Sequence, residues 1–341
     1  MVRRRPGRVR GHRREAIPDR HDAVEQGHGA HGWRHVMRRL SPVFAVAVLA
    51  LVGFLLYRTL GRYSLDQIVA SILAVPMHRL VQAGGFAAAS YLCLSGFDAL
   101  AVRYAGHRLP YRKVALASFV SLSIGHNVGL AALSSGAVRY RFYSRWGLSA
   151  GDVAKVIVFC GTTVGLGLAI LAGVVLLADP SLVQEITGLG RVLIRTIGGA
   201  CLVSAVVYVL LAVVLRRPLR IGDWMLQMPA PGLALGQVVI GPVNFAFVAA
   251  CLHQTIAATA DLPYLSVATA YVTANVSVLV THVPGGLGVL EGVVLLLLPH
   301  TDIIGALVLF RVVYFLVPLC LGGLAFAAAE AWRRRNPHAR Q

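Results

Sequence analysis

The sequence has little charge for its length. Only 13% of its 341 residues are Asp, Glu, Lys or Arg, whereas 57% are hydrophobic, and the mean hydropathy is +0.70. Because a soluble protein of this size needs more charge to cover its surface, a soluble globular fold is excluded. The apolar runs are continuous rather than alternating, which argues against a membrane β-barrel. The sequence therefore predicts an all-α, polytopic membrane helix bundle.

Motifs for disulfides, metal binding and catalysis are also missing. Each of the five cysteines lies inside an apolar segment and none has CxxC spacing, so neither a disulfide framework nor a zinc site is indicated. We find no nucleophile–base pattern, no P-loop and no HExxH. We therefore expect no catalytic residues, no metal and no cofactor. The cysteines are Cys93, Cys160, Cys201, Cys251 and Cys320.

The basic residues that are present lie at the chain ends and in loops. A net charge of +18 is compatible with nucleic-acid binding, but long uncharged stretches separate the charges. This distribution instead fits the positive-inside rule for membrane proteins and contact with anionic lipid headgroups. Residues 1–39 hold eleven Arg and four acidic residues and are predicted to be a disordered, basic cytoplasmic tail. Residues 40–331 form the membrane domain and 332–341 a short basic cytoplasmic tail. The tail histidines either bind a metal or, as we prefer, are solvated; they are His12, His21, His28, His31 and His35.

Nine apolar segments follow the tail and predict about 7–8 transmembrane helices plus broken or re-entrant segments. Segment 114–134 decides the topology, because a full crossing would place the next basic loop outside and invert the later loops. We favour a segment that enters the membrane and returns, with both termini cytoplasmic. A full crossing with a few translocated arginines is the alternative. The segments are 42–60, 80–102, 114–134, 152–178, 191–215, 233–256, 264–282, 284–299 and 305–329.

Two stretches of the chain match at an offset of 156 residues. The matching pairs are Ser121 and Ser277, His126 and His282, Gly129 and Gly285, and Gly136 and Gly292. Each stretch is preceded and followed by a long apolar helix, and the two blocks begin on opposite sides of the membrane. This pattern is typical of an inverted repeat, an architecture of transporters that bind substrate where broken helices meet. Coincidence in glycine-rich apolar sequence is the alternative.

Two charged residues lie within apolar sequence near the second stretch. Glu291 follows Pro-Gly-Gly-Leu-Gly-Val-Leu and precedes an apolar run, where an ionised carboxylate is costly unless it is paired or hydrated. It either binds a cation or proton or serves as a structural salt bridge or helix cap. Arg311 lies in a predicted helix with Tyr314 on the same face, and Glu291 or a lipid phosphate is its natural partner. The alternative is that Arg311 extends to the membrane interface.

The other candidates flank the two broken segments. Arg139, Tyr140 and Arg141 directly follow the first, where guanidinium groups suit a phosphate, although ordinary loop charge explains them equally well. Glycine-interrupted half-helices expose backbone N–H groups that favour an anion, and the histidines can protonate near neutral pH. Asp98 is a weaker candidate. The predicted substrate-binding residues are Glu291, Arg311, Arg139, Arg141, Tyr140, Tyr314, His126, His282, Gly285, Gly286 and Gly288.

Three stretches resemble the transmembrane (flippase) region of the lysylphosphatidylglycerol synthase/flippase family: 135–143, 284–292 and 311–318. The resemblance extends over about residues 40–330. It implies a membrane region that translocates aminoacylated phosphatidylglycerol to the outer leaflet, whereas a separate C-terminal domain of that family makes the lipid from aminoacyl-tRNA. Since the chain stops soon after its last predicted helix, we expect no aminoacyl-transferase domain and no enzymatic activity.

The predicted function is a lipid flippase that moves a phospholipid, with or without an aminoacyl group, or a lipid-linked anion. In this hypothesis the arginines bind phosphate and Glu291 binds an ammonium group or a coupling proton. A small-solute secondary transporter and a membrane partner or scaffold of a separately encoded lipid-modifying enzyme are the alternatives. We expect a bacterial cytoplasmic (inner) membrane location, anionic phospholipid as partner, and no nucleic acid.

Overall fold

The computed structural model describes residues 75–128, 131–215, 219–221, 224–281, 283, 286–298 and 303–335, together with residues 50, 54, 69 and 73. The chain divides into two units, 1–48 and 49–341, and every described residue lies in the second. The predicted N-terminal tail, most of the first predicted helix, 42–60, and residues 336–341 therefore lie outside the described residues, whereas residues 332–335 of the predicted C-terminal tail belong to the last helix.

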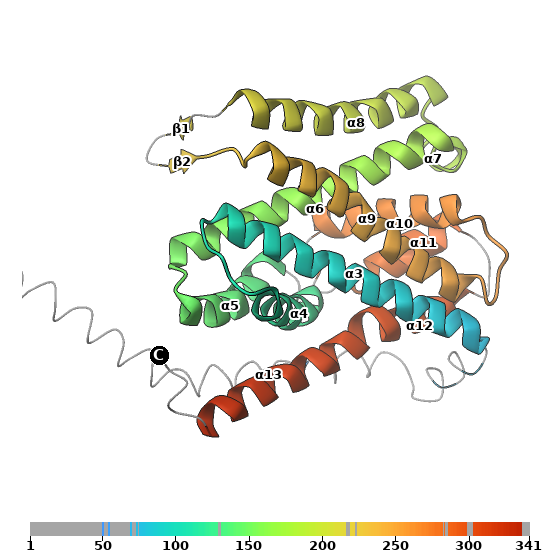
Figure 1. The fold of residues 1–341 in the computed structure, drawn as a ribbon. Helices are drawn as coiled ribbons and strands as arrows, with labels where there is room; N and C mark the ends of the chain where they lie inside the picture. The colour runs from blue at the N-terminus through green and yellow to red at the C-terminus, as the bar shows by residue number, and fades with distance from the viewer. Residues whose placement is uncertain are drawn as a thin grey trace, which may run out of the picture. The chain divides into compact units, whose positions relative to one another are not determined.

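Helices make up nearly all of the described part, which confirms the all-α class (Figure 1). The helices are α3 (Met77–Tyr104), α4 (Tyr111–Val128), α5 (Ala131–Tyr143), the 3₁₀ turn η1 (Ser144–Trp146), α6 (Ala150–Ala178), α7 (Ser181–Thr187), α8 (Arg191–Val214), α9 (Pro231–Ile256), α10 (Tyr264–Thr281), α11 (Val289–Leu297), α12 (Ile303–Arg311), the π-helical turn η3 (Val312–Leu316) and α13 (Val317–Arg335). A small antiparallel pair of strands, β1 (Leu219–Ile221) and β2 (Trp224–Leu226), lies between α8 and α9 and was not predicted.

Six helical stretches of the described part are long and apolar enough to cross a membrane. They are α3, α6, α8, α9, α10 and the continuous run Ile303–Arg333. Helix α8 buries only four of its residues, Ile194, Gly198, Ala205 and Ala212, and exposes most of its valines and leucines. Such a surface is stable in lipid rather than in water, so the predicted polytopic membrane bundle is confirmed.

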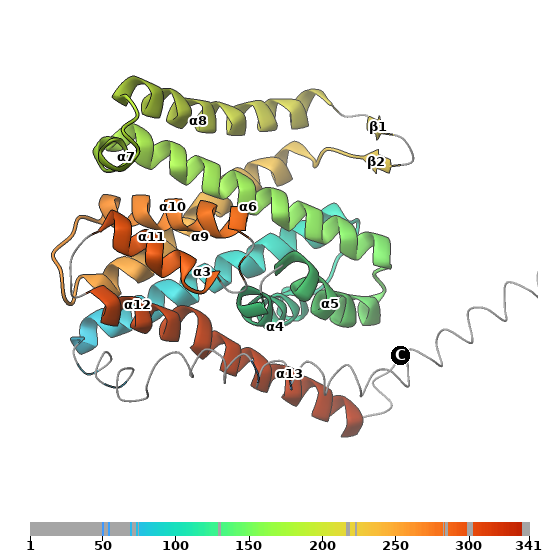
Figure 2. The same cartoon turned by 180° about the vertical axis from the view of Figure 1, so that it is seen from behind.

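Helices α4 and α5 form a hairpin whose two ends lie on one side of the bundle. His107, just before α4, lies with Nε2 3.2 Å from Oδ2 of Asp152 in the first turn of α6. The segment that leaves α3 therefore ends beside the segment that enters α6. Figures 1 and 2 show α4 almost end-on while α3 and α6 lie across the view, so α4 does not run parallel to them. This arrangement agrees with the predicted entry and return at 114–134, with the hairpin extended to 111–143.

Helices α10 and α11 form a second hairpin, which opens on the opposite side of the bundle (Figure 2). Helix α11 has nine residues, too few to cross a bilayer of about 30 Å at 1.5 Å per residue. The apolar run 284–299, which the sequence separates from 264–282, is therefore the return arm of this hairpin rather than a crossing helix.

The two hairpins belong to an internal repeat. Adding 156 to the bounds of α3, α4, α5 and α6 gives 233–260, 267–284, 287–299 and 306–334. These ranges coincide within four residues with α9, α10, α11 and the helical run 303–335. Helix α3 runs opposite to α9, and α6 runs opposite to α13, in both views (Figures 1 and 2). Opposed directions in matching helices are the mark of an inverted repeat.

Glycines allow the long helices of the two halves to touch. At the crossing of α6 and α9, a Cβ added to Gly167 would lie 2.5 Å from the carbonyl carbon of Gly241. No larger residue fits between these backbones. Because lipid supplies no hydrophobic force between helices, close backbone contact is a main source of stability here. The crossing therefore places the second half, with its hairpin, firmly against the first.

Candidate functional site

Glu291 and Arg311 form an ion pair inside the bundle. Nε and Nη2 of Arg311 donate to the two carboxylate oxygens of Glu291, the Nη2 bond being 3.0 Å long. Nη2 also donates to the carbonyl oxygen of Gly286 at 2.9 Å. The side chain of Arg311 is 2% exposed, whereas that of Glu291 is 15% exposed. The sequence expectation that Glu291 is the partner of Arg311 is thus confirmed, and its carboxylate is the accessible member of the pair.

The glycine-rich turn before α11 positions the carboxylate. Gly286 and Gly288 have φ values of +58° and +85°, which residues with a side chain rarely adopt. The backbone N–H of Gly288 donates to Oε2 of Glu291 at 2.9 Å and so caps the start of α11. A carboxylate at a helix N-terminus is stabilised by the helix dipole. Glu291 therefore acts as a cap and as an ion-pair partner at the same time.

The tip of the first hairpin reaches the same stretch of chain. The ring of His126 stacks on that of Tyr314, with centroids 6.4 Å apart, and Nδ2 of Asn127 lies 3.5 Å from the carbonyl oxygen of Phe315. The guanidinium of Arg311 lies 5.0 Å from the centroid of the Phe315 ring. Residues 311–316, which include the π-helical turn η3, therefore connect the second hairpin to the first. π-Helical turns inside α-helices often mark functional sites.

Polar residues of the long helices complete this centre. The hydroxyl of Tyr314 lies 2.9 Å from Oγ of Ser90, which donates to Oδ1 of Asn244 at 2.7 Å. The ring of Tyr91 contacts those of both His126 and Tyr314. The sequence singled out Tyr314 and His126 but missed Ser90 and Tyr91, because a serine or tyrosine within an apolar helix is too common to be a signal.

Arg139 forms a second buried ion pair, with Asp98 of α3. Its Nε and Nη2 donate to Oδ1 and Oδ2 of Asp98 at 2.8 and 2.9 Å, and Nη1 donates to Oγ of Ser135 at 2.8 Å. Oγ of Ser118 and the hydroxyl of Tyr143 also donate to the carboxylate, at 2.7 and 3.0 Å. The side chains of Asp98 and Arg139 are 0% and 3% exposed. Each charge is thus matched without a ligand.

Residues 42–322 match the family described as the lysylphosphatidylglycerol synthase TM region. The chain belongs to this family. It is 30% identical over 308 residues to "Uncharacterized protein slr0712" of Synechocystis, which covers 89% of this chain and 96% of the relative. It is 28% identical over 310 residues to "Inner membrane protein YbhN" of Escherichia coli, covering 89% and 95%. Both hairpins and both ion pairs lie within the matched region.

Arg141 contributes to a charged cluster at the end of the bundle where α5 and α13 meet. Its Nη2 donates to Oε2 of Glu330 at 2.9 Å, and Arg145 and Arg333 lie 3.3 and 3.0 Å from the same carboxylate. Burial, and next the charge of Arg333, lower the pKa of Arg145 to about 10, so it remains protonated at neutral pH. Neighbouring Tyr140 is half-buried. The structure therefore separates Arg141 and Tyr140 from the Glu291–Arg311 pair.

The remaining predicted site residues lie outside the described residues or at the surface. His282 and Gly285 are not described, and Gly288 is exposed next to Glu291. Within residues 75–335, as far as they are described, no group of three or more His, Cys, Asp or Glu could hold a metal ion. The residues that the structure brings together are Glu291, Arg311, Gly286, Gly288, Tyr314 and His126.

Proposed function

We propose that this protein is a membrane transporter of the lipid flippase type. Its substrate is an anionic phospholipid, with or without an aminoacyl group, or another lipid-linked anion. The observation that carries the proposal is the Glu291–Arg311 ion pair at the centre where two hairpins from opposite sides approach residues 311–316. Inverted-repeat transporters bind their substrates at such a place.

The ion pair supplies the chemistry that a lipid headgroup needs. A phosphate accepts two parallel hydrogen bonds from a guanidinium, as a carboxylate does, so it can replace Glu291 on Arg311. Glu291, the more accessible partner at 15% exposure, then binds a proton or the ammonium group of the headgroup. We leave Arg139 out of this step because the carboxylate on it, Asp98, is 0% exposed, whereas Glu291 is 15% exposed.

Further polar groups at the centre support a ligand site. Nδ1 of His126 is buried and has no hydrogen-bond partner in the described part of the chain. A buried, unpaired nitrogen costs about 1–3 kcal/mol, and this cost disappears when a ligand supplies the missing bond. His126 stacks on Tyr314, whose hydroxyl continues the polar path to Ser90. The proposed path for the headgroup thus has polar partners beyond the ion pair.

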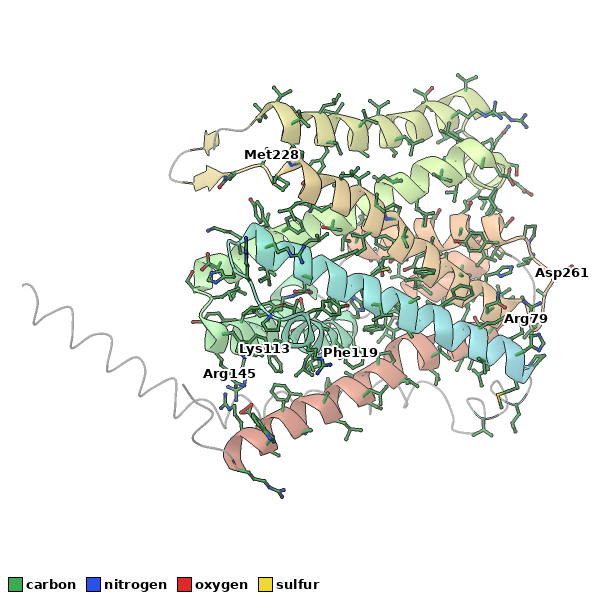
Figure 3. The ribbon with its side chains drawn as sticks, viewed as in Figure 1. Arg79, Lys113, Phe119, Arg145, Met228 and Asp261 are labelled. Carbon is green, nitrogen blue, oxygen red and sulfur yellow. The ribbon has the colours of Figure 1, made fainter. Side chains whose placement is uncertain are left out.

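We propose that the end of the bundle with the first hairpin's loops is cytoplasmic, in the inner membrane. Lys113 and Arg145 lie toward this end, whereas Asp261 lies at the other (Figure 3). Basic loops remain on the cytoplasmic side. The basic residues of this end include Arg103, Arg108, Arg112, Lys113, Arg141, Arg145, Lys155, Arg333 and Arg335, with the acidic residues Asp152 and Glu330. Arg79, Arg191 and Arg195 lie toward the other end, with Asp179, Glu185 and Asp261. The name of the Escherichia coli relative, an inner membrane protein, agrees with this location.

The test is translocation of headgroup-labelled phosphatidylglycerol in proteoliposomes that contain the full-length chain. Replacing Glu291 with Gln keeps an acceptor oxygen but removes the charge. If the charge contributes about 1.4 kcal/mol to headgroup binding, its removal weakens that binding tenfold. We therefore expect the translocation rate to fall about tenfold or more. The matched control is Glu185→Gln, the same change at an exposed position of α7, which is expected to leave the rate unchanged.

Two results would contradict the proposal. One is an unchanged translocation rate for a folded Glu291→Gln protein. The other is the absence of translocation of phosphatidylglycerol and its aminoacylated form by a folded wild-type protein. The second result would favour a small-solute transporter or a scaffold for a lipid-modifying enzyme.

A further inference from the structure

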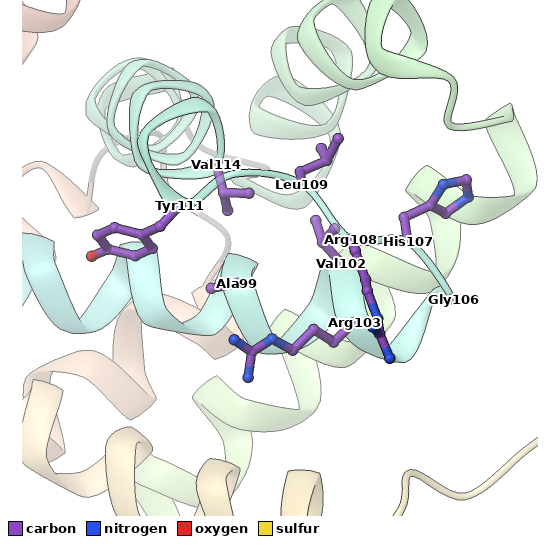
Figure 4. Close-up of a pocket in the computed structure, with 9 residues that line it drawn as sticks. All are labelled: Ala99, Val102, Arg103, Gly106, His107, Arg108, Leu109, Tyr111 and Val114. Atoms are coloured by element: carbon purple, nitrogen blue, oxygen red, sulfur yellow. The ribbon is translucent and has the colours of Figure 1, made fainter.

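A basic pocket lies at the end of α3, away from the hairpin tips (Figure 4). It has a volume of about 690 Å³ and is lined by Arg103, His107, Arg108 and Tyr111 together with glycine and apolar residues. Arg103 is twelve positions after Tyr91, which contacts Tyr314, so the pocket lies about 18 Å along α3 from that centre at 1.5 Å per residue. The pocket is therefore a separate feature of the fold.

An apolar groove of about 440 Å³ adjoins this pocket. It runs between α3 and α9, and all its lining residues except Arg103 are apolar. Ala99 and Arg103 line both the groove and the pocket. Val239 and Val243, on the α9 side, are 57% and 39% exposed, so the groove opens outward on the bundle surface. A basic end and an apolar groove thus form one continuous surface.

The two arginines of the pocket are not neutralised by the protein. Neither Arg103 nor Arg108 makes a hydrogen bond or ion pair with any described residue, and both are exposed. They contrast with Arg139, Arg141 and Arg311, which all donate to carboxylates. Tyr111, whose hydroxyl lies 2.6 Å from Oγ of Ser95, adds an aromatic ring to the lining of the pocket, as at many membrane interfaces. The pocket thus combines unpaired positive charge with an interfacial aromatic ring.

We propose that this surface binds one anionic phospholipid of the leaflet on the same side. The phosphate lies against Arg103 and Arg108, and one acyl chain occupies the groove between α3 and α9. The headgroup is expected to be anionic because of charge complementarity: basic pockets between membrane helices bind anionic lipid headgroups. The groove favours a lipid over a free anion, because an acyl chain can contact the apolar lining along its length and a free phosphate cannot. This site does not depend on the proposed transport.

The experiment is native mass spectrometry of the full-length protein with added phosphatidylglycerol or phosphatidylcholine of the same acyl chains. We expect the wild type to retain phosphatidylglycerol preferentially. The double variant Arg103→Gln/Arg108→Gln is expected to retain about tenfold less phosphatidylglycerol, with little change for phosphatidylcholine. Ala99→Phe, which fills the region shared by pocket and groove, is expected to reduce retention of both lipids.

Matched controls separate this site from others. Arg112→Gln makes the same change in the same basic region but outside the pocket, and Glu185→Gln changes an exposed charge of α7 away from both proposed lipid sites; both are expected to retain phosphatidylglycerol like the wild type. The proposal is overturned if the double variant, folded by thermal melting, retains phosphatidylglycerol fully. It is also overturned if millimolar inorganic phosphate displaces the lipid completely, since the site would then recognise an anion only.

Discussion

The two buried ion pairs of this protein have the same chemistry but different surroundings. The Asp98 carboxylate accepts four hydrogen bonds, and its side chain and that of Arg139 are almost inaccessible. The Glu291 carboxylate lies beside a glycine turn and remains 15% exposed. A saturated, enclosed pair holds helices together, whereas a pair with an accessible carboxylate can exchange its partner. We therefore assign a structural role to the Asp98–Arg139 pair and a role in ligand binding to the Glu291–Arg311 pair.

The internal repeat sharpens this contrast. Subtracting 156 from 291 gives 135, so Ser135 occupies in the first hairpin the position of Glu291 in the second. Each of these residues accepts a hydrogen bond from an arginine, Arg139 or Arg311. In the first half the acidic partner comes instead from the long helix α3. The two halves thus share a backbone plan but not the placement of charge.

The largest expected effect is on stability, from Asp98→Asn. This change leaves the buried guanidinium of Arg139 without a counter-charge, which costs about 3–5 kcal/mol. Glu291→Gln is expected to cost less, about 1–3 kcal/mol, because its site is accessible and glutamine keeps an acceptor. Unfolding free energies of the purified protein in mixed micelles measure both. Equal losses would contradict the division of roles between the pairs.

A smaller effect is expected from Tyr143→Phe. The phenol donates one of the four hydrogen bonds to Asp98, and its loss leaves the other three. We expect a stability loss of about 1.5 kcal/mol, the lower value for a hydrogen bond to a charged group. Tyr140→Phe is the matched control, since the Tyr140 hydroxyl has no hydrogen bond to the described residues. A loss in the control as large as in Tyr143→Phe would argue against the role given to Asp98.

Much of the fold could be predicted from the sequence. Apolar length predicts spanning helices, and the position of basic loops predicts that 114–134 enters and returns, because both depend on local composition. A few matching residues of the sequence indicated the repeat. The helix boundaries of the structure extend it to α3, α4, α5 and α6 and their four counterparts 156 residues later. The strand pair between α8 and α9 was not predicted, because three-residue strands carry no periodic signal.

The site was predictable only in part. Glu291 and Arg311 stand out because charge is rare in apolar sequence, and their pairing follows from the cost of burying either alone. The partner of Arg139 did not emerge, because pairing Asp98 with a residue 41 positions later depends on how α3 packs against the hairpin. Glu330 was missed for a similar reason, since two of its arginine partners, Arg141 and Arg145, lie 189 and 185 positions earlier in the chain.

Reaction with a lipophilic carbodiimide, followed by mass spectrometry of the peptides, tests the difference between the pairs most directly. Such a reagent modifies carboxyl groups that it can reach from the membrane. The account predicts modification of Glu291 in the folded protein and none of Asp98 until the protein unfolds. Modification of Asp98 at a rate equal to or above that of Glu291 would contradict it.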